Sequence, residues 1–131
     1  MKLRVQVVIE SDDDDEHTPA MHEVAQIDRD ALSVDTLGLH LDEAKHLLQK
    51  VQAVLIDEQV RTSLAQQVAC PSCGRPRAHK DTKTIVTRTL FGSLYLRSPR
   101  WHQCPCQPQT TRTFSPLAAA LPERTTPELL Y

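Results

Sequence analysis

All four cysteines of the chain fall into two short pairs, Cys70-x-x-Cys73 and Cys104-x-Cys106, with thirty residues between the pairs. A Cys-x-x-Cys turn followed by glycine points two thiolates at one centre, and a hairpin between the pairs would bring the second pair beside the first. The spacing therefore predicts a structural zinc site with four sulfur ligands. Because the second pair is one residue tighter than the usual knuckle, His102 is an alternative to one of its cysteines.

Two other kinds of chemistry use paired cysteines, namely stable disulfides and a redox-active Cys-x-x-Cys motif. The N-terminal residues lead into a short, alternating, charged run that does not resemble a signal peptide. We therefore expect a cytoplasmic chain, in which stable disulfides are disfavoured. A thioredoxin-like motif requires a βαβ setting around Cys70, whereas the sequence predicts a hairpin after it. Zinc is favoured, and the two alternatives stay open.

Charge divides the chain into two halves. Residues 1–67 carry 6 Lys and Arg against 14 Asp and Glu, whereas residues 68–131 carry 9 against 3. The total charge of −2 therefore hides a basic module that contains all the cysteines, which suggests a polyanion as its partner. No apolar run approaches the ~20 residues that a membrane-spanning helix needs, so we expect no membrane partner.

The first half has the pattern of a β-hairpin followed by a long helix. Residues 2–10 and 21–27 alternate apolar and polar side chains, as half-buried strands do, and the acidic run at 11–16 suits a solvated loop between them. Apolar residues then recur at three- and four-residue spacing over 42–67. A helix of ~26 residues spans ~39 Å and is too long for this hairpin to cover. We expect it to pack on further protein or to form a homodimer through 42–67.

The second half has the pattern of a hairpin with basic residues on and around it. Residues 83–91 and 94–97 flank Gly92-Ser93, a loop of the type with glycine first, which would place Arg88 directly opposite Arg97. Opposed arginines repel unless an anion lies between them, so the pair predicts either a phosphate-binding face or two splayed, solvated side chains. Trp101 either stacks on a base or packs beside the zinc site. The candidate phosphate contacts are Arg75, Arg77, Lys80, Lys83, Arg88, Arg97 and Arg100.

These elements predict an α+β fold in three parts. A β-hairpin and a long helix occupy 1–67, a zinc-ribbon-like β-hairpin module occupies 68–107, and a Pro/Thr-rich tail occupies 108–131. The tail contains a helix start at Thr126-Pro127, with proline at the first helical position. We expect the full protein to continue from this helix into a further domain.

Several segments, in order along nearly the whole chain, together resemble the N-terminal region of ISKra-type bacterial insertion-sequence transposases. They are residues 2–10, Leu-Gly-Leu-x-Leu-x-Glu-Ala-Lys at 37–45, Cys-Pro-Ser-Cys-Gly at 70–74, Arg-Thr-Leu-Phe-Gly at 88–92, Ser-Pro-Arg at 98–100, Cys-Pro-Cys at 104–106 and Leu-Pro-Glu-Arg-Thr-Thr-Pro-Glu-Leu at 121–129. The ordered series is far more specific than any single segment.

The resemblance implies a DNA-binding segment that takes part in recognising transposon ends and precedes an RNase H-like catalytic domain. No carboxylate of this chain matches a catalytic position of that domain, so the resemblance implies a fragment that is not itself an enzyme. The residues leave two other functions open: a zinc-capped helical dimerisation or protein-interaction module, and a metal-dependent enzyme. An enzyme is disfavoured because four thiolates saturate zinc and leave no position for water.

Overall fold

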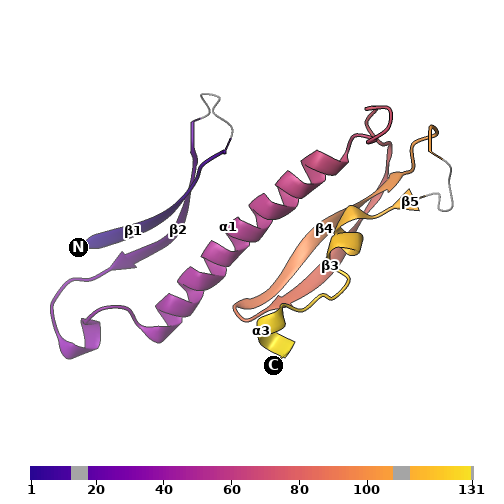
Figure 1. Cartoon of the computed structure of the whole chain (residues 1–131). Coiled ribbons are helices and arrows are strands. Elements are labelled where there is room, and N and C mark those ends of the chain that lie inside the picture. Colours follow the sequence, from indigo (N-terminus) through magenta and orange to yellow (C-terminus); the bar gives the residue numbers. More distant parts are fainter. Residues whose placement is uncertain (13–17, 108–112, 131) are drawn as a thin grey trace. The chain divides into compact units, whose positions relative to one another are not determined.

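The structure, a computed structural model, describes residues 1–12, 18–107 and 113–130 and divides into two compact units, 1–56 and 57–131. Figure 1 shows the elements in chain order: a two-stranded sheet, a long helix α1 (Leu41–Gln67), a three-stranded sheet and two short C-terminal helices. Both sheets are antiparallel. The predicted α+β class is confirmed, and the boundary between the two units falls within α1.

The first unit begins with an antiparallel hairpin of β1 (Lys2–Ile9) and β2 (Ala20–Asp28), which confirms the two strands expected from alternation. The apolar residues of one face are sheltered, with Val24 and Ile27 buried and Val5 and Val7 half-buried. Successive side chains of a strand point to opposite faces, but Val24 and Ile27 are three residues apart, because the pairing shifts between Val5 and Gln6 and skips Val24. Alternation therefore predicts the two strands but not this irregularity in β2. Residues 13–16 of the expected acidic loop lie outside the described residues.

Arg29 organises the connector between β2 and α1, which contains the short 3-10 helix η1 (Val34–Thr36). Its Nε donates a hydrogen bond to the carbonyl oxygen of Thr36 (3.1 Å), and a terminal nitrogen donates to that of Gly38 (3.0 Å). Gly38 has a φ of +68°, a conformation that glycine adopts without strain. The same guanidinium forms an ion pair with Glu43, which ties the connector to the first turn of α1.

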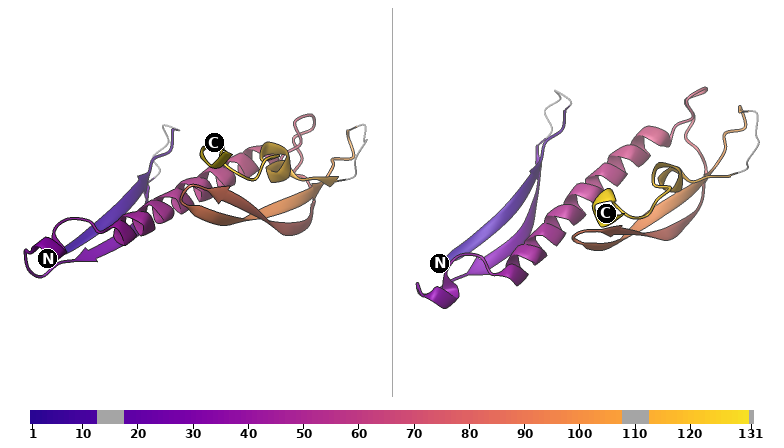
Figure 2. Two further views of the ribbon diagram at one scale, coloured as in Figure 1. Left: turned by 90° about the horizontal axis from the view of Figure 1, so that it is seen from below. Right: turned by 60° about the horizontal axis from the view of Figure 1, so that its bottom comes forward.

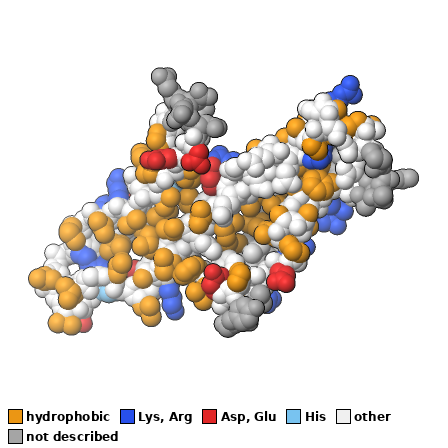
Figure 3. Space-filling model, viewed as in Figure 1, with side chains coloured by type: hydrophobic (Ala, Val, Ile, Leu, Met, Phe, Trp, Pro, Cys, Tyr) orange, Lys and Arg blue, Asp and Glu red, His pale blue; other side chains and the backbone are white. Residues whose placement is uncertain are grey.

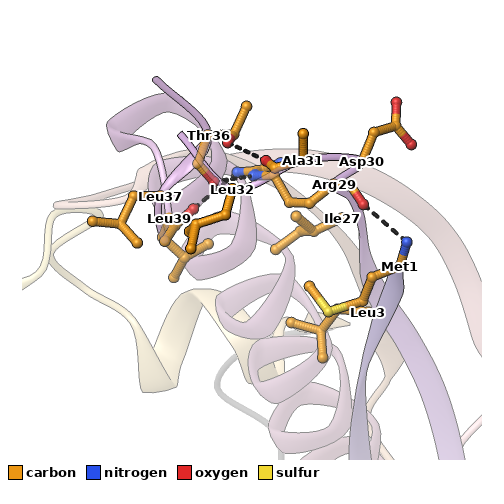
Figure 4. Close-up of a pocket in the computed structure, with 11 residues that line it drawn as sticks. Met1, Leu3, Ile27, Arg29, Asp30, Ala31, Leu32, Thr36, Leu37 and Leu39 are labelled. Carbon is orange, nitrogen blue, oxygen red and sulfur yellow. Dashed lines mark hydrogen bonds between the residues drawn. The ribbon is translucent and has the colours of Figure 1, made fainter. Parts of the chain in front are cut away.

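An apolar hollow of about 430 Å³ lies beside this connector. Figure 4 shows the side chains around it, with the amino group of Met1 directed at the carbonyl oxygen of Arg29 (2.9 Å). Most of the lining is aliphatic, and Leu32 and Leu37 are exposed. The hollow is thus a surface feature of the first unit.

The helix α1 runs over 27 residues, in agreement with the span predicted from periodicity, and none of its residues is buried. Asp42 and Glu43 occupy its first turn, where the positive end of the helix dipole favours acidic side chains. Leu41, Leu48 and Leu55, seven residues apart, are exposed. In the described part of the chain, no helix combines the length and the apolar character that a membrane crossing requires.

The second unit is built on a long antiparallel hairpin of β3 (His79–Thr89) and β4 (Gly92–His102), and β4 also pairs with the short β5 (Thr113–Phe114). Helices α2 (Pro116–Ala120) and α3 (Pro127–Leu130) follow, each with proline at its start. The core of this unit lies on one face of the hairpin. Its buried residues include Ile85, Thr87, Ser98 and Leu117.

The C-terminal segment, expected as a tail, packs against this hairpin from β5 onward. Both views of Figure 2 show it lying along the hairpin. The Arg88 amide donates to the carbonyl oxygen of Arg124 (2.8 Å), and the Thr126 amide donates to that of Arg88 (2.9 Å). Leu117 of α2 is only 3% exposed. The described residues 113–130 therefore belong to the fold of the second unit.

The predicted register of this hairpin is wrong. The turn consists of Leu90 and Phe91, so Arg88 pairs with Ser93 and Arg97 pairs with Thr84. Gly92, with a φ of +117°, follows the turn and does not open it. The Thr89 hydroxyl donates to the Gly92 carbonyl oxygen (2.7 Å) and accepts from the Phe91 amide (3.2 Å), which holds the turn. The observed register avoids opposing two arginines and extends the ladder to His79 and Trp101.

Candidate metal centre

The first cysteine pair lies in a tight turn just after α1. The Cys70 amide donates to the carbonyl oxygen of Arg75 (2.8 Å), and the Gly74 amide donates to that of Cys70 (2.9 Å). Gly74 has a φ of +74° with open space around its Cα, so glycine is needed here for its conformation and not for its size. The turn brings the side chains of Cys70 and Cys73 to the same side.

The β3–β4 ladder brings the second pair to the first. It ends with His79 opposite Trp101, and the His102 amide donates to the carbonyl oxygen of Ala78 (2.8 Å). Cys104 follows two residues later, where the Gln107 amide donates to its carbonyl oxygen (3.0 Å). The two cysteine pairs, distant in sequence, therefore lie at the same end of the hairpin.

The four Sγ atoms all lie within 4.8 Å of one another. Cys70 Sγ lies 3.5 Å from Cys106 Sγ, and Cys73 Sγ lies 3.3 Å from Cys104 Sγ. Tetrahedral coordination with metal–sulfur distances of ~2.3 Å would place the sulfur atoms about 3.8 Å apart. These positions fit a metal site, and none of the four cysteines, all of them among the described residues, forms a disulfide. His102 is not part of this group.

Hydrogen bonds within the cluster shift the pKa values of Cys70 and Cys106 in opposite directions. Backbone hydrogen bonds from Cys73 and Ser72 lower the pKa of Cys70 to about 6, although burial opposes this change. Hydrogen bonds to the other cysteines, Cys104 first, raise the pKa of Cys106 to about 12. Four sulfur atoms this close can all be thiolates only when a cation compensates their charge. The arrangement therefore favours a cation that ligates all four.

A small core supports the cysteine cluster. Trp101 is buried, and its ring centroid lies 6.3 Å from that of Phe114 in β5. The Arg77 guanidinium lies 4.9 Å from the Phe114 ring centroid and donates to the carbonyl oxygen of Gln67 at the end of α1. Of the two roles considered for Trp101, burial favours packing beside the cysteines.

Two of the seven candidate phosphate contacts are held by the protein itself. Arg77 is half-buried in the contacts just described. Arg100 lies opposite Asp81 and forms an ion pair with it. Hydrogen bonding to Asp81 raises the pKa of Arg100, and hydrogen bonding to Arg100 lowers the pKa of Asp81.

The other five candidates are exposed and form no ion pair with the described residues. Arg88 and Arg97 lie on the open face of the hairpin, opposite the packed core. Lys83 pairs with the buried Ser98 and so belongs to the other face. The remaining two are Arg75, in the cysteine turn, and Lys80, at the irregularity between His79 and Asp81. The structure therefore places two of the basic residues on one face, apart from each other, and distributes the others.

Sequence reasoning did not single out two residues near these sites. Gln107 Nε2 donates to the Ser72 hydroxyl and lies 3.7 Å from Cys70 Sγ and 3.9 Å from Cys106 Sγ, so it supports the cysteines from outside. Tyr95 lies on the open face and is 73% exposed. Its alternation with Leu94 and Leu96 was the available signal, because it places Tyr95 on the face away from them.

The comparisons with known proteins identify no relative. No protein-family model, no curated protein and no solved structure matches this chain.

Proposed function

We propose that this chain is a non-catalytic, DNA-binding part of a transposase, that it holds one structural zinc ion, and that it binds transposon ends. The resemblance of its ordered segments to ISKra-type transposases supports the transposase assignment. Zinc is supported by the ligand set, because four thiolates at tetrahedral spacing are typical of structural zinc sites. Such a site is saturated and has no position for a reacting water.

The observation that carries DNA binding is the surface charge of the cysteine-bearing module. Residues 68–131 carry a balance of +6, and five of the seven candidate phosphate contacts are exposed without an ion pair among the described residues. Unpaired cations on a small module attract the phosphate backbone and release its counterions. Arg88 and Arg97 are the two of these five that share the open face of the hairpin.

Titration of the pure chain against a labelled duplex at several salt concentrations tests this proposal. Each phosphate contact contributes ~0.9 to the slope of log affinity against log salt, so five contacts give at most about 4.5. Arg88→Gln and Arg97→Gln should each reduce the slope by ~0.9, equally for transposon-end and scrambled duplexes. Absence of binding at low salt would contradict the proposal.

Homodimerisation through α1 is a second candidate, favoured by a specific feature of the first unit. Figure 3 shows hydrophobic side chains spread over the visible surface of this unit. Leu41, Leu48 and Leu55 are 72%, 44% and 52% exposed and recur every seven residues along the helix. Apolar residues that repeat every seven positions pack well between two helices. The partner proposed for this row of leucines is therefore α1 of a second copy of the chain.

Added salt should have opposite effects on DNA binding and on homodimerisation. Residues 1–67 carry a balance of −8, so self-association through α1 should strengthen when added salt screens the repulsion. DNA binding should weaken under the same conditions. Sedimentation at increasing protein and salt concentrations measures the mass directly. Leu48→Gln with Leu55→Gln should abolish a dimer, and Lys50→Gln on the same helix is the matched control; a monomeric mass throughout would exclude this candidate.

A further inference from the structure

The open face of the β3–β4 hairpin carries basic, hydroxyl and apolar side chains and no acidic one. Paired residues of an antiparallel ladder share a face, so the register assigns its members. Its β3 members alternate with the buried Ile85, Thr87 and Thr89. The open face comprises Thr82, Thr84, Val86 and Arg88 from β3 and Ser93, Tyr95, Arg97 and Pro99 from β4.

Tyr95 occupies the middle of this face. It lies directly opposite Val86, which is 37% exposed, whereas Tyr95 itself is 73% exposed. A tyrosine that contributes to a core would have been placed on the other face, where Leu94 and Leu96 are half-buried. The ring is therefore available to a ligand with a flat, apolar surface.

The two arginines of the face flank this ring. Arg97 is two residues from Tyr95 on the same strand, about 7 Å along it. Arg88 pairs with Ser93 and so lies diagonally on the other side of Tyr95. The two arginines are four ladder positions apart, about 13 Å, so one phosphate cannot bridge them, as the predicted register would have allowed. An aromatic ring between two separated cations suits a base with a phosphate on either side.

We infer that this face binds single-stranded DNA, with an unpaired base stacked on Tyr95 and the neighbouring phosphates near Arg88 and Arg97. This inference rests on the proposed function and names the form of DNA that the site accepts. In a duplex the faces of the bases are covered by their neighbours, so an exposed ring gains a stacking contact only from an unpaired base. The absence of acidic residues from the described face favours a polyanion over an uncharged aromatic ligand.

The test compares one labelled oligonucleotide, single-stranded and as a duplex, with the full zinc-loaded chain and three kinds of variant. Tyr95→Ala removes the ring, Tyr95→Phe keeps it, and Arg88→Gln and Arg97→Gln remove the cations. We expect the single strand to bind more tightly than the duplex. Tyr95→Ala should weaken single-strand binding at least about fivefold, and Tyr95→Phe should stay within about twofold of the unsubstituted chain. Zinc content and unfolding temperature show that each variant is folded.

Salt dependence provides a second readout. Tyr95→Ala should leave the salt slope for the single strand unchanged, because the ring contacts no phosphate, whereas each arginine variant should reduce it by ~0.7. If Tyr95→Ala binds the single strand as well as the unsubstituted chain, or if the duplex binds more tightly, this inference is wrong and the proposed function stands. If neither form of DNA binds, both this inference and the proposed DNA-binding function are wrong. The open face would then be a site for a protein partner.

Discussion

Arg100 lies directly across the β3–β4 ladder from Asp81, and its guanidinium donates hydrogen bonds to both oxygens of that carboxylate. Two parallel hydrogen bonds hold both groups in a single geometry. A guanidinium so engaged would have to break this pair before it could bind a phosphate. Arg100 therefore acts within the hairpin, unlike Arg88 and Arg97, whose side chains are exposed and form no ion pair with the described residues.

We expect Arg100→Gln to lower the unfolding temperature of the second unit by a few degrees. The effect is modest because the side chains of Arg100 and Asp81 are 26% and 40% exposed, so solvent screens the pair. The pKa of Asp81 is lowered, so the pair stabilises the fold above the ordinary pKa of 3.8 and loses this contribution as pH falls further. Thermal unfolding at pH 7 measures the loss. Arg97→Gln is the matched control, and equal unfolding temperatures for the two variants would contradict the assignment.

Zinc should be present at one ion per chain and should be required for folding of the second unit. Cysteine ligands must lose their protons to bind, so the free energy of metal binding is coupled to folding. Elemental analysis of protein purified under reducing conditions gives the stoichiometry, and circular dichroism before and after chelation gives the dependence. A metal content near zero, or full retention of zinc by the double variant Cys104→Ser, Cys106→Ser, would rule out the site.

The ion pair of Arg29 with Glu43 should make the stability of the first unit depend on pH in acid. Hydrogen bonding to Arg29 lowers the pKa of Glu43 from 4.5 to about 2. The contribution is therefore complete above pH 4.5 and is lost as pH falls towards 2, because the folded protein resists protonation there. Urea unfolding of the unsubstituted chain and Glu43→Gln should show a difference at pH 7 that shrinks in this window. Glu23→Gln, which removes the more exposed pair with Arg4 in the same unit, is the control, and a pH-independent difference for Glu43→Gln would refute the linkage.

The chain alone should neither cut nor join DNA. Strand transfer requires carboxylates that hold divalent metal ions beside the reacting phosphate, and none of its carboxylates matches such a position in the resembled family. Incubation of rigorously purified protein with a supercoiled plasmid carrying transposon ends, with and without magnesium, measures cleavage. Magnesium-dependent nicking that follows the protein through purification would overturn this expectation.

Local patterns in the sequence were enough to predict most of the elements. Alternation predicted β1 and β2, and the spacing of apolar residues predicted α1, because the periods of strand and helix depend only on backbone geometry. The cysteine spacing predicted that the four cysteines lie close together, and this prediction also depended only on local geometry. A Cys-x-x-Cys turn places its two thiols together by itself, and any antiparallel hairpin returns the chain to its starting point.

The tertiary structure alone decided the hairpin register and the roles of the arginines. A glycine near a hairpin turn can be the first residue of the turn or the residue that follows it. The presence of Gly92 in the sequence did not distinguish these two positions. The choice depends on the whole ladder, including the pairing of Asp81 with Arg100 and the avoidance of Arg88 opposite Arg97. Tyr95 became a central residue of the open face only once this register was known. Which residues meet across a sheet depends on free energies summed over many distant contacts, whereas element type and ligand chemistry depend on a few neighbouring residues.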